Sequence, residues 1–209
     1  MSPGHLAFDS SPLNYMARAA QLPLLEKLVA GNDCVVMQAV EEELLRGASK
    51  HAQLYQISAQ EWIRVVDDSS IGFLQLFSEY HARLGGGGHN IGESATLAYA
   101  EMHGLTACID DRTARRHGQE RGVKLTGTLE LVCQGIRANV VAEAEAARVV
   151  DLLRDHEAAC RTGRERAGVP AAGRAAPRVR RRHGSRAGGG RGCGRGMPPA
   201  RVCRAAAGR

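Results

Sequence analysis

The sequence contains no run of about 20 apolar residues, the length that a membrane-spanning helix requires. Its first residues also lack the basic-then-apolar layout of a secretory signal. We therefore expect a soluble, cytoplasmic protein with no membrane partner. The six cysteines form no C-x-x-C pair and no zinc-type spacing. We expect them to be reduced, with Cys34 and Cys108 in apolar strands of the core.

Two common catalytic patterns are also missing. The glycine-rich segment LGGGGHN (84–90) lacks the Lys-Ser/Thr of a phosphate-binding P-loop and does not complete G-x-G-x-x-G. No Ser/His/Asp or Cys/His pairing is readable along the chain. The segment is therefore expected to be a flexible loop that precedes Glu93.

The last 50 residues have almost no large apolar side chains. Residues 160–209 carry 14 Arg, no Lys and one acid, a net charge of +13, whereas residues 1–159 carry 14 basic and 21 acidic residues, a net charge of −7. Such a tail cannot bury enough surface to offset chain entropy, so it is predicted to be disordered. Two interpretations stay open: an unselected, frame-shifted extension, or an arginine-rich arm that holds RNA or DNA phosphates.

A first prediction concerns this basic tail. Deletion of residues 160–209 is expected to leave a folded acidic domain, residues 1–159, as measured by circular dichroism. If the tail holds RNA, its removal also weakens RNA binding and flattens the salt dependence of binding, because fewer counterions are released. If the tail is an unselected extension, the activity of the domain at physiological salt stays the same. Loss of helical signal in the truncated chain would contradict the boundary.

Short apolar segments alternate with helical periodicity along residues 5–159. The expected strands are HLAF (5–8), CVVM (34–37), EWIRVVDD (61–68), TACI (106–109) and VKLTG (123–127). The expected helices are 10–21, 22–29, 38–47 with a stop at Gly47, 71–84, 90–104, 112–120, 128–141 and 142–159. This alternation predicts an α/β fold with a parallel sheet covered by helices on both faces.

Acidic residues stand at the ends of two predicted strands. Asp9 ends the first strand, and Asp110 and Asp111 end the fourth. If these strands are neighbours, the three acids meet beyond the carboxyl edge of the sheet, where ligands of such folds bind. Glu93 begins a helix on its apolar side, which is an unusual place for a carboxylate.

Each acid also has a purely structural interpretation. Asp9, or the pair Asp110 and Asp111, suits a helix N-terminus. Glu43 lies within EEE, and a charge run is usually a solvated helix face. As a group, however, uncompensated carboxylates repel one another, and a hard cation such as Mg²⁺ or Mn²⁺ relieves that repulsion.

Five segments occur in the order seen in PIN-domain proteins, and the chain resembles that family over roughly residues 4–140. They are LAFDSSPLNYMARAAQLPLLEKL, VEEELL, GESATLAYA, CIDDRTARR and RGVKLTGTLELV. The resemblance implies a three-layer α/β/α sandwich and metal-dependent cleavage of RNA. It also implies that Asp9, Glu43, Glu93, Asp110 and Asp111 are the catalytic, metal-binding acids, and it leaves open which of Asp110 and Asp111 is the principal ligand.

The resemblance also implies partners. Many small bacterial members of the family are toxins, so an RNA substrate and an antitoxin protein are expected. The apolar helix 71–84 suits either a homodimer contact or the core. The alternative function is a non-catalytic RNA-binding or protein-interaction domain on the same scaffold.

Overall fold

A computed structural model describes residues 4–86 and 90–166. Most of the basic tail and His89 lie outside the described residues, so the predictions made for them stay predictions. Helix α9 (Glu143–Arg166) continues through the predicted boundary at residue 159. Along the described chain, no helix combines the length and apolar character needed to cross a membrane.

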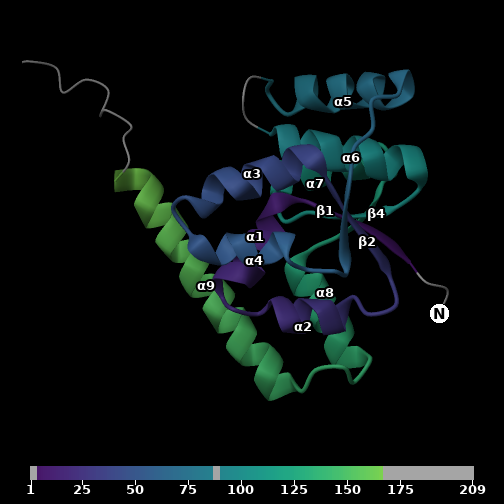
Figure 1. The fold of residues 1–209 in the computed structure, drawn as a ribbon. Helices are drawn as coiled ribbons and strands as arrows, with labels where there is room; N and C mark the ends of the chain where they lie inside the picture. The colour runs from purple at the N-terminus through teal and green to yellow at the C-terminus, as the bar shows by residue number, and fades with distance from the viewer. Residues whose placement is uncertain (1–3, 87–89, 167–209) are drawn as a thin grey trace, which may run out of the picture. The chain divides into compact units, whose positions relative to one another are not determined.

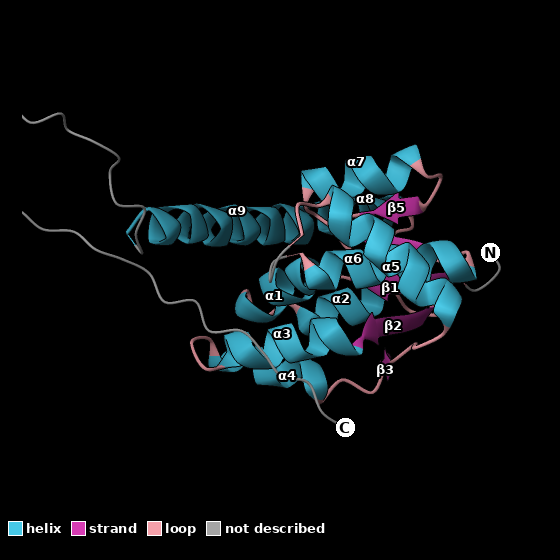
Figure 2. Cartoon of the chain, turned by 90° about the horizontal axis from the view of Figure 1, so that it is seen from above, coloured by secondary structure: helices cyan, strands magenta, loops and turns pink. Residues whose placement is uncertain are grey.

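The centre of the fold is a five-stranded parallel sheet with the order β3-β2-β1-β4-β5. The strands are β1 (His5–Phe8), β2 (Asp33–Met37), β3 (Ile63–Val66), β4 (Thr106–Cys108) and β5 (Lys124–Thr126). Figure 2 shows β3 and β5 at opposite edges. The predicted α/β class, its strands and its parallel sheet are confirmed.

Helices cover both faces of this sheet, which gives the predicted three-layer sandwich (Figure 1). They are α1 (Ser10–Arg18), α2 (Leu22–Leu28), α3 (Gln38–Ala48), α4 (Tyr55–Ser58), α5 (Ile71–Arg83), α6 (Ile91–His103), α7 (Arg112–Glu120), α8 (Thr128–Arg137) and α9, with a 3₁₀ turn η1 (Ala52–Leu54). α6 packs on β1, β2 and β4, and α5 packs on the outside of α6. α1, α2 and α8 lie on the opposite face, and α9 packs against α1 and α8.

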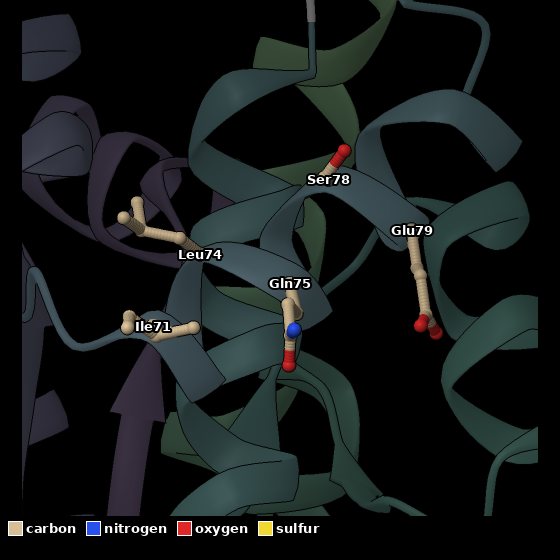
Figure 3. Close-up of a pocket in the computed structure, with 5 residues that line it drawn as sticks. All are labelled: Ile71, Leu74, Gln75, Ser78 and Glu79. Carbon is tan, nitrogen blue, oxygen red and sulfur yellow. The ribbon is translucent and has the colours of Figure 1, made fainter.

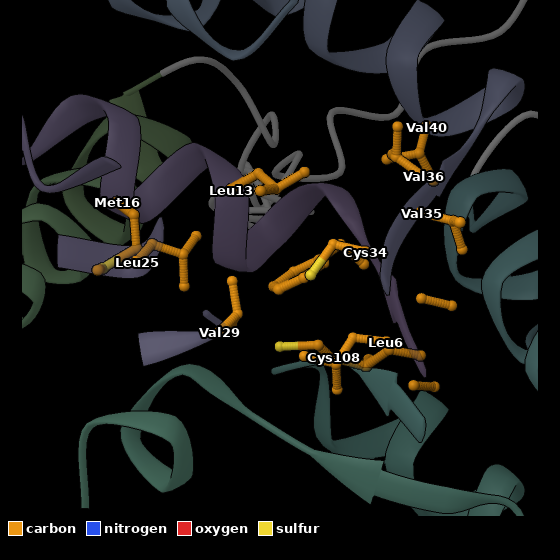
Figure 4. Close-up of a cluster of buried hydrophobic side chains, with 14 of the residues drawn as sticks. Leu6, Leu13, Met16, Leu25, Val29, Cys34, Val35, Val36, Val40 and Cys108 are labelled. Atoms are coloured by element: carbon orange, nitrogen blue, oxygen red, sulfur yellow. The ribbon is translucent and has the colours of Figure 1, made fainter. Parts of the chain in front are cut away.

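The core between the sheet and the helices is mostly aliphatic. Leu13 and Met16 of α1 and Leu25 of α2 are fully buried above the strands (Figure 4). Cys34 of β2 and Cys108 of β4 are buried free thiols in the two strands that flank β1, and their burial is as expected. Burial of about 0.8 kcal/mol per methylene makes such side chains the main stabilising contribution.

Some predicted element boundaries differ from the structure. Helix α3 continues through Gly47 to Ala48, and the helix expected over 128–141 ends at Arg137. The turn and helix over residues 52–58 were not predicted, because so short a segment shows no full helical period. Helix α5 buries Phe73 and Tyr80, so it contributes to the core.

The lone tryptophan contacts the strand that ends at Asp9. The Trp62 ring is partly buried and meets the Phe8 ring edge-on, with 6.2 Å between centroids. Its indole N–H donates to Gln60 at 3.0 Å. The aromatic pair therefore joins the start of β3 to the end of β1 across the intervening strand.

A partly exposed ionic network joins α5 and α6 to the end of α7. Arg121, at the end of α7, donates from two guanidinium nitrogens to Glu101 of α6, both at 2.7 Å. A third nitrogen reaches Glu79 of α5 at 2.6 Å, and the Tyr80 hydroxyl donates to Glu101 at 2.6 Å. Because a two-pronged Arg–carboxylate contact has a specific geometry, the network fixes α6 relative to α5 and to the end of α7.

Candidate active site

The acids meet where the strand order reverses. β1 pairs with both β2 and β4, so the chain crosses over in opposite directions on either side of β1. The Asp9 N–H donates to the Cys108 carbonyl at 3.0 Å, which places Asp9 beside the residues that follow β4. The carboxyl ends of β1 and β4 are therefore adjacent, as required for one site.

Asp9 has one satisfied oxygen and one unsatisfied oxygen. Its Oδ2 accepts from the Ser11 N–H at 3.2 Å and caps α1, so the structural interpretation of this residue is also correct. Its Oδ1 is buried and has no hydrogen-bond partner among the described residues. Burial first, and then the charges of Glu93 and Glu43, raise the pKa of Asp9 to about 7. An unpaired buried carboxylate oxygen is costly unless a cation or proton accompanies it.

The N-terminal end of α6 brings Glu93 to the same place. Thr96, one turn further along, is buried and donates its hydroxyl to the Phe8 carbonyl at 3.4 Å. Glu93 therefore faces the end of β1, on the packed side of its helix. Burial, followed by the nearby charges of Glu43 and Asp111, raises the pKa of Glu93.

Glycine at position 92 allows Glu43 to approach Asp9. A Cβ placed on Gly92 would lie 2.8 Å from Glu43 Oε2 and 3.5 Å from Asp9 Oδ1. Both carboxylates thus lie against the backbone of α6 at one point. Glu43 sits on an exposed face of α3, yet its carboxylate reaches the acid group. Asp9, Glu43 and Glu93 are therefore one cluster.

The two aspartates after β4 have different surroundings. Asp110 accepts two hydrogen bonds from Thr128, at Oδ1 from the N–H (2.8 Å) and at Oδ2 from the hydroxyl (2.5 Å), so it caps the start of α8. Asp111 caps α7 by accepting from the Ala114 N–H at Oδ1 (2.8 Å). Asp111 also adds to the electrostatic field at Glu93. Asp110 is thus held by α8, whereas Asp111 lies near enough to Glu93 for its charge to raise the pKa of Glu93.

A cleft of about 570 Å³ opens beside the acids. Its lining residues come from five helices and the connections between them: Ser11, Tyr15, Asn90, Glu93, Asp110, Asp111, Arg112, Thr128, Leu129, Val150, Leu153 and Arg154. Sequence reasoning missed Thr128 and the α9 residues. Thr128 follows the fifth strand, and its place near the carboxyl edge was a usable signal. No pattern in the sequence indicates that α9 returns to this edge.

The acids do not form a complete cation site as they stand. Within the described ranges, no three Asp, Glu, His or Cys side chains come close enough together to hold a metal ion.

A second recess, on the outer face of α5, is lined by Ile71, Leu74, Gln75, Ser78 and Glu79 (Figure 3). It offers no comparable chemistry, because its one acid, Glu79, is already paired with Arg121.

Comparison with known proteins identifies the family. The sequence model of the PIN domain matches residues 5–166, most of the chain. Among curated proteins, no match is found. The family match and the parallel α/β/α fold agree, and members of this family are generally nucleases. The chain belongs to the PIN-domain family.

Proposed function

We propose that this chain is a divalent-metal-dependent ribonuclease that hydrolyses RNA phosphodiester bonds. The observation that carries the proposal is the buried, unpartnered Oδ1 of Asp9, which faces Glu43 and Glu93 at the reversal of the sheet. Carboxylates that repel one another in a buried place are the usual ligands of a hard cation. Because members of this family are generally nucleases, metal-dependent cleavage of RNA is the function that best accounts for these carboxylates.

The donor set fits Mg²⁺ or Mn²⁺. Both ions prefer carboxylate oxygens and retain several waters, which suits a site beside an open cleft. Asp9, Glu43, Glu93 and Asp111 are the residues that would hold the ion. Because no three of the described acids are close enough to hold an ion, these side chains would have to move closer together to bind it.

The chain's own groups supply the positioning of the ligands. A divalent ion held by these acids would polarise the phosphodiester and lower the pKa of a bound water. Burial and neighbouring charges raise the pKa of Glu93 in the metal-free protein, so a cation that relieves this repulsion would favour its charged form. The Ser11 N–H keeps Asp9 oriented, so that Oδ1 points toward the other acids.

We assign different roles to the two aspartates after β4, and paired variants test the assignment. Asp110→Ala leaves the buried Thr128 N–H unpaired and is expected to cost about 1–3 kcal/mol of unfolding free energy. Asp111→Asn keeps the cap on α7 but removes a charge near Glu93. It is expected to keep the melting temperature and to raise the Mn²⁺ concentration needed for half-maximal cleavage. Thermal melts and Mn²⁺ titration measure the two effects. If Asp111→Asn instead lowers the melting temperature and Asp110→Ala instead raises the Mn²⁺ requirement, Asp110 is the metal ligand and Asp111 the structural residue.

A toxin role with a cognate antitoxin is part of this proposal and rests on the family resemblance. Exposed Ile71 and Leu74 on α5, at 77% and 50% of their full exposure, are a candidate contact for a protein partner or a second copy of the chain. Co-expression with a neighbouring open reading frame that relieves growth arrest is the direct test. Growth that is unaffected by the chain alone would count against a toxin.

The second candidate function is a non-catalytic RNA-binding or protein-interaction domain. The lack of a preformed three-carboxylate group among the described residues favours it. The deciding experiment incubates the full-length protein and single-stranded RNA with a chelator, with Mg²⁺ or with Mn²⁺. Cleavage that needs the ion supports the ribonuclease, whereas RNA that binds but stays intact under all three conditions supports the second candidate.

A further inference from the structure

We propose that Arg112 and Arg154 bind RNA phosphates in the cleft beside the acid cluster and so position the substrate there. The inference rests on the proposed ribonuclease function and adds the residues that hold the substrate. Arg112 is the first residue of α7, directly after Asp111, and Arg154 lies on α9. Both line the same cleft as Glu93.

Two arginines in an acid-lined cleft would be expected to pair with its carboxylates. Neither Arg112 nor Arg154 makes an ion pair or hydrogen bond with any residue that the structure describes. The next arginines of α7 behave differently, since Arg115 pairs with Glu130 at 3.0 Å and Arg116 with Glu120 at 3.8 Å. The guanidinium groups of Arg112 and Arg154 thus keep their donors available.

The place of Arg112 is not explained by helix stability. A cation in the first turn of a helix meets the positive end of the helix dipole and is mildly destabilising. Arg154 likewise is exposed rather than needed for packing, because the buried side chains of α9 are those of Ala146, Val149 and Leu153. Both side chains thus have their charged ends where a ligand in the cleft can reach them.

An RNA backbone is the ligand whose chemistry fits this arrangement. Its phosphates are repelled by the acid cluster, so an enzyme with this site needs cations beside the acids to hold the strand. An arginine guanidinium can donate two parallel hydrogen bonds to one phosphate. Tyr15, Val150 and Leu153 give the α9 side of the cleft an apolar surface against which a sugar or base can lie.

The test measures binding separately from cleavage. Full-length wild-type protein, Arg112→Ala and Arg154→Ala are titrated against a short fluorescein-labelled single-stranded RNA in excess chelator, at several salt concentrations. Each variant is expected to bind about tenfold more weakly, as for loss of a charged hydrogen bond. The slope of log affinity against log salt should fall in magnitude by about 0.7 for each lost phosphate contact. With Mn²⁺ present, KM should rise by a similar factor while kcat changes little.

Arg148→Ala is the matched control, because Arg148 is exposed on α9 and does not line the cleft. Arg154→Lys should recover the salt slope but only part of the affinity, since it keeps the charge and loses the planar fork. If wild type cuts RNA and Arg112→Ala and Arg154→Ala bind it as tightly as Arg148→Ala, this inference is wrong and the ribonuclease proposal stands. If wild type neither binds nor cuts RNA, both are overturned.

Discussion

Asp9→Asn and Glu93→Gln are each expected to reduce metal-dependent RNA cleavage by roughly 100-fold or more, while the protein stays folded. Each substitution removes one carboxylate from the cluster and keeps the shape of the side chain. Asn at position 9 still accepts from the Ser11 N–H, so the cap on α1 remains. Because each change also removes a repelling charge, the melting temperature without metal should hold or rise.

Matched controls separate this effect from a general loss of negative charge. Asp67→Asn alters an exposed aspartate that directly follows β3, and Glu42→Gln alters the neighbour of Glu43. Both controls should cut RNA at the wild-type rate. Wild-type cleavage by Asp9→Asn and Glu93→Gln as well would show that these acids do not form the metal site.

The second large effect is a pH-dependent stability that Mn²⁺ changes. The pKa of Asp9 is raised from 3.8 to about 7 on folding, so the folded state binds this proton more tightly than the unfolded chain. The resulting stabilisation is complete below pH 4 and is lost as the pH rises through 7. The metal-free protein should therefore lose on the order of 3 kcal/mol of this contribution between pH 4 and pH 8. Urea unfolding across that range, compared with Asp9→Asn, isolates the contribution of Asp9.

Mn²⁺ should reverse the loss near neutral pH. At about 100 times its Kd, a ligand of the folded state adds about 2.7 kcal/mol, which corresponds to a rise of roughly 5–10 °C in Tm. The rise should be smaller at pH 5.5, because protons compete with the ion for the same oxygens. The Asp9→Asn variant should lack this pH dependence of the unfolding free energy, and its Tm should rise less than that of the wild type when Mn²⁺ is added. If Mn²⁺ does not change the Tm of the wild-type protein at pH 8, the proposed metal site is wrong.

The order of the strands along the chain was predictable because each one is a short apolar run. The meeting of Asp9 with Asp110 and Asp111 needed one further fact, that β1 and β4 are neighbours, which the sequence left as a condition and the structure supplies. Glu93 was identifiable because it is a charge on the packed side of a helix, and the structure places it beside the end of β1.

Other parts of the site could not be predicted from the sequence. Asp110 and Asp111 are the same residue type at adjacent positions, and only the contact of Asp110 with Thr128 distinguishes them. That contact depends on the orientation that α8 takes after β5, and the local sequence does not determine this orientation. Arg154 has no sequence signal at all, because the return of α9 to the carboxyl edge depends on packing against α1 and α8.

Because Trp62 contacts Phe8, the fluorescence of this tryptophan can report on the end of β1. The chain has one tryptophan, so its tryptophan fluorescence has a single source. That source touches the residue just before Asp9, in the middle of the sheet. Circular dichroism of this helix-rich fold reports mainly on the outer layers. Tryptophan emission instead reports on the strand that bears the buried carboxylate, without a label or an added mutation.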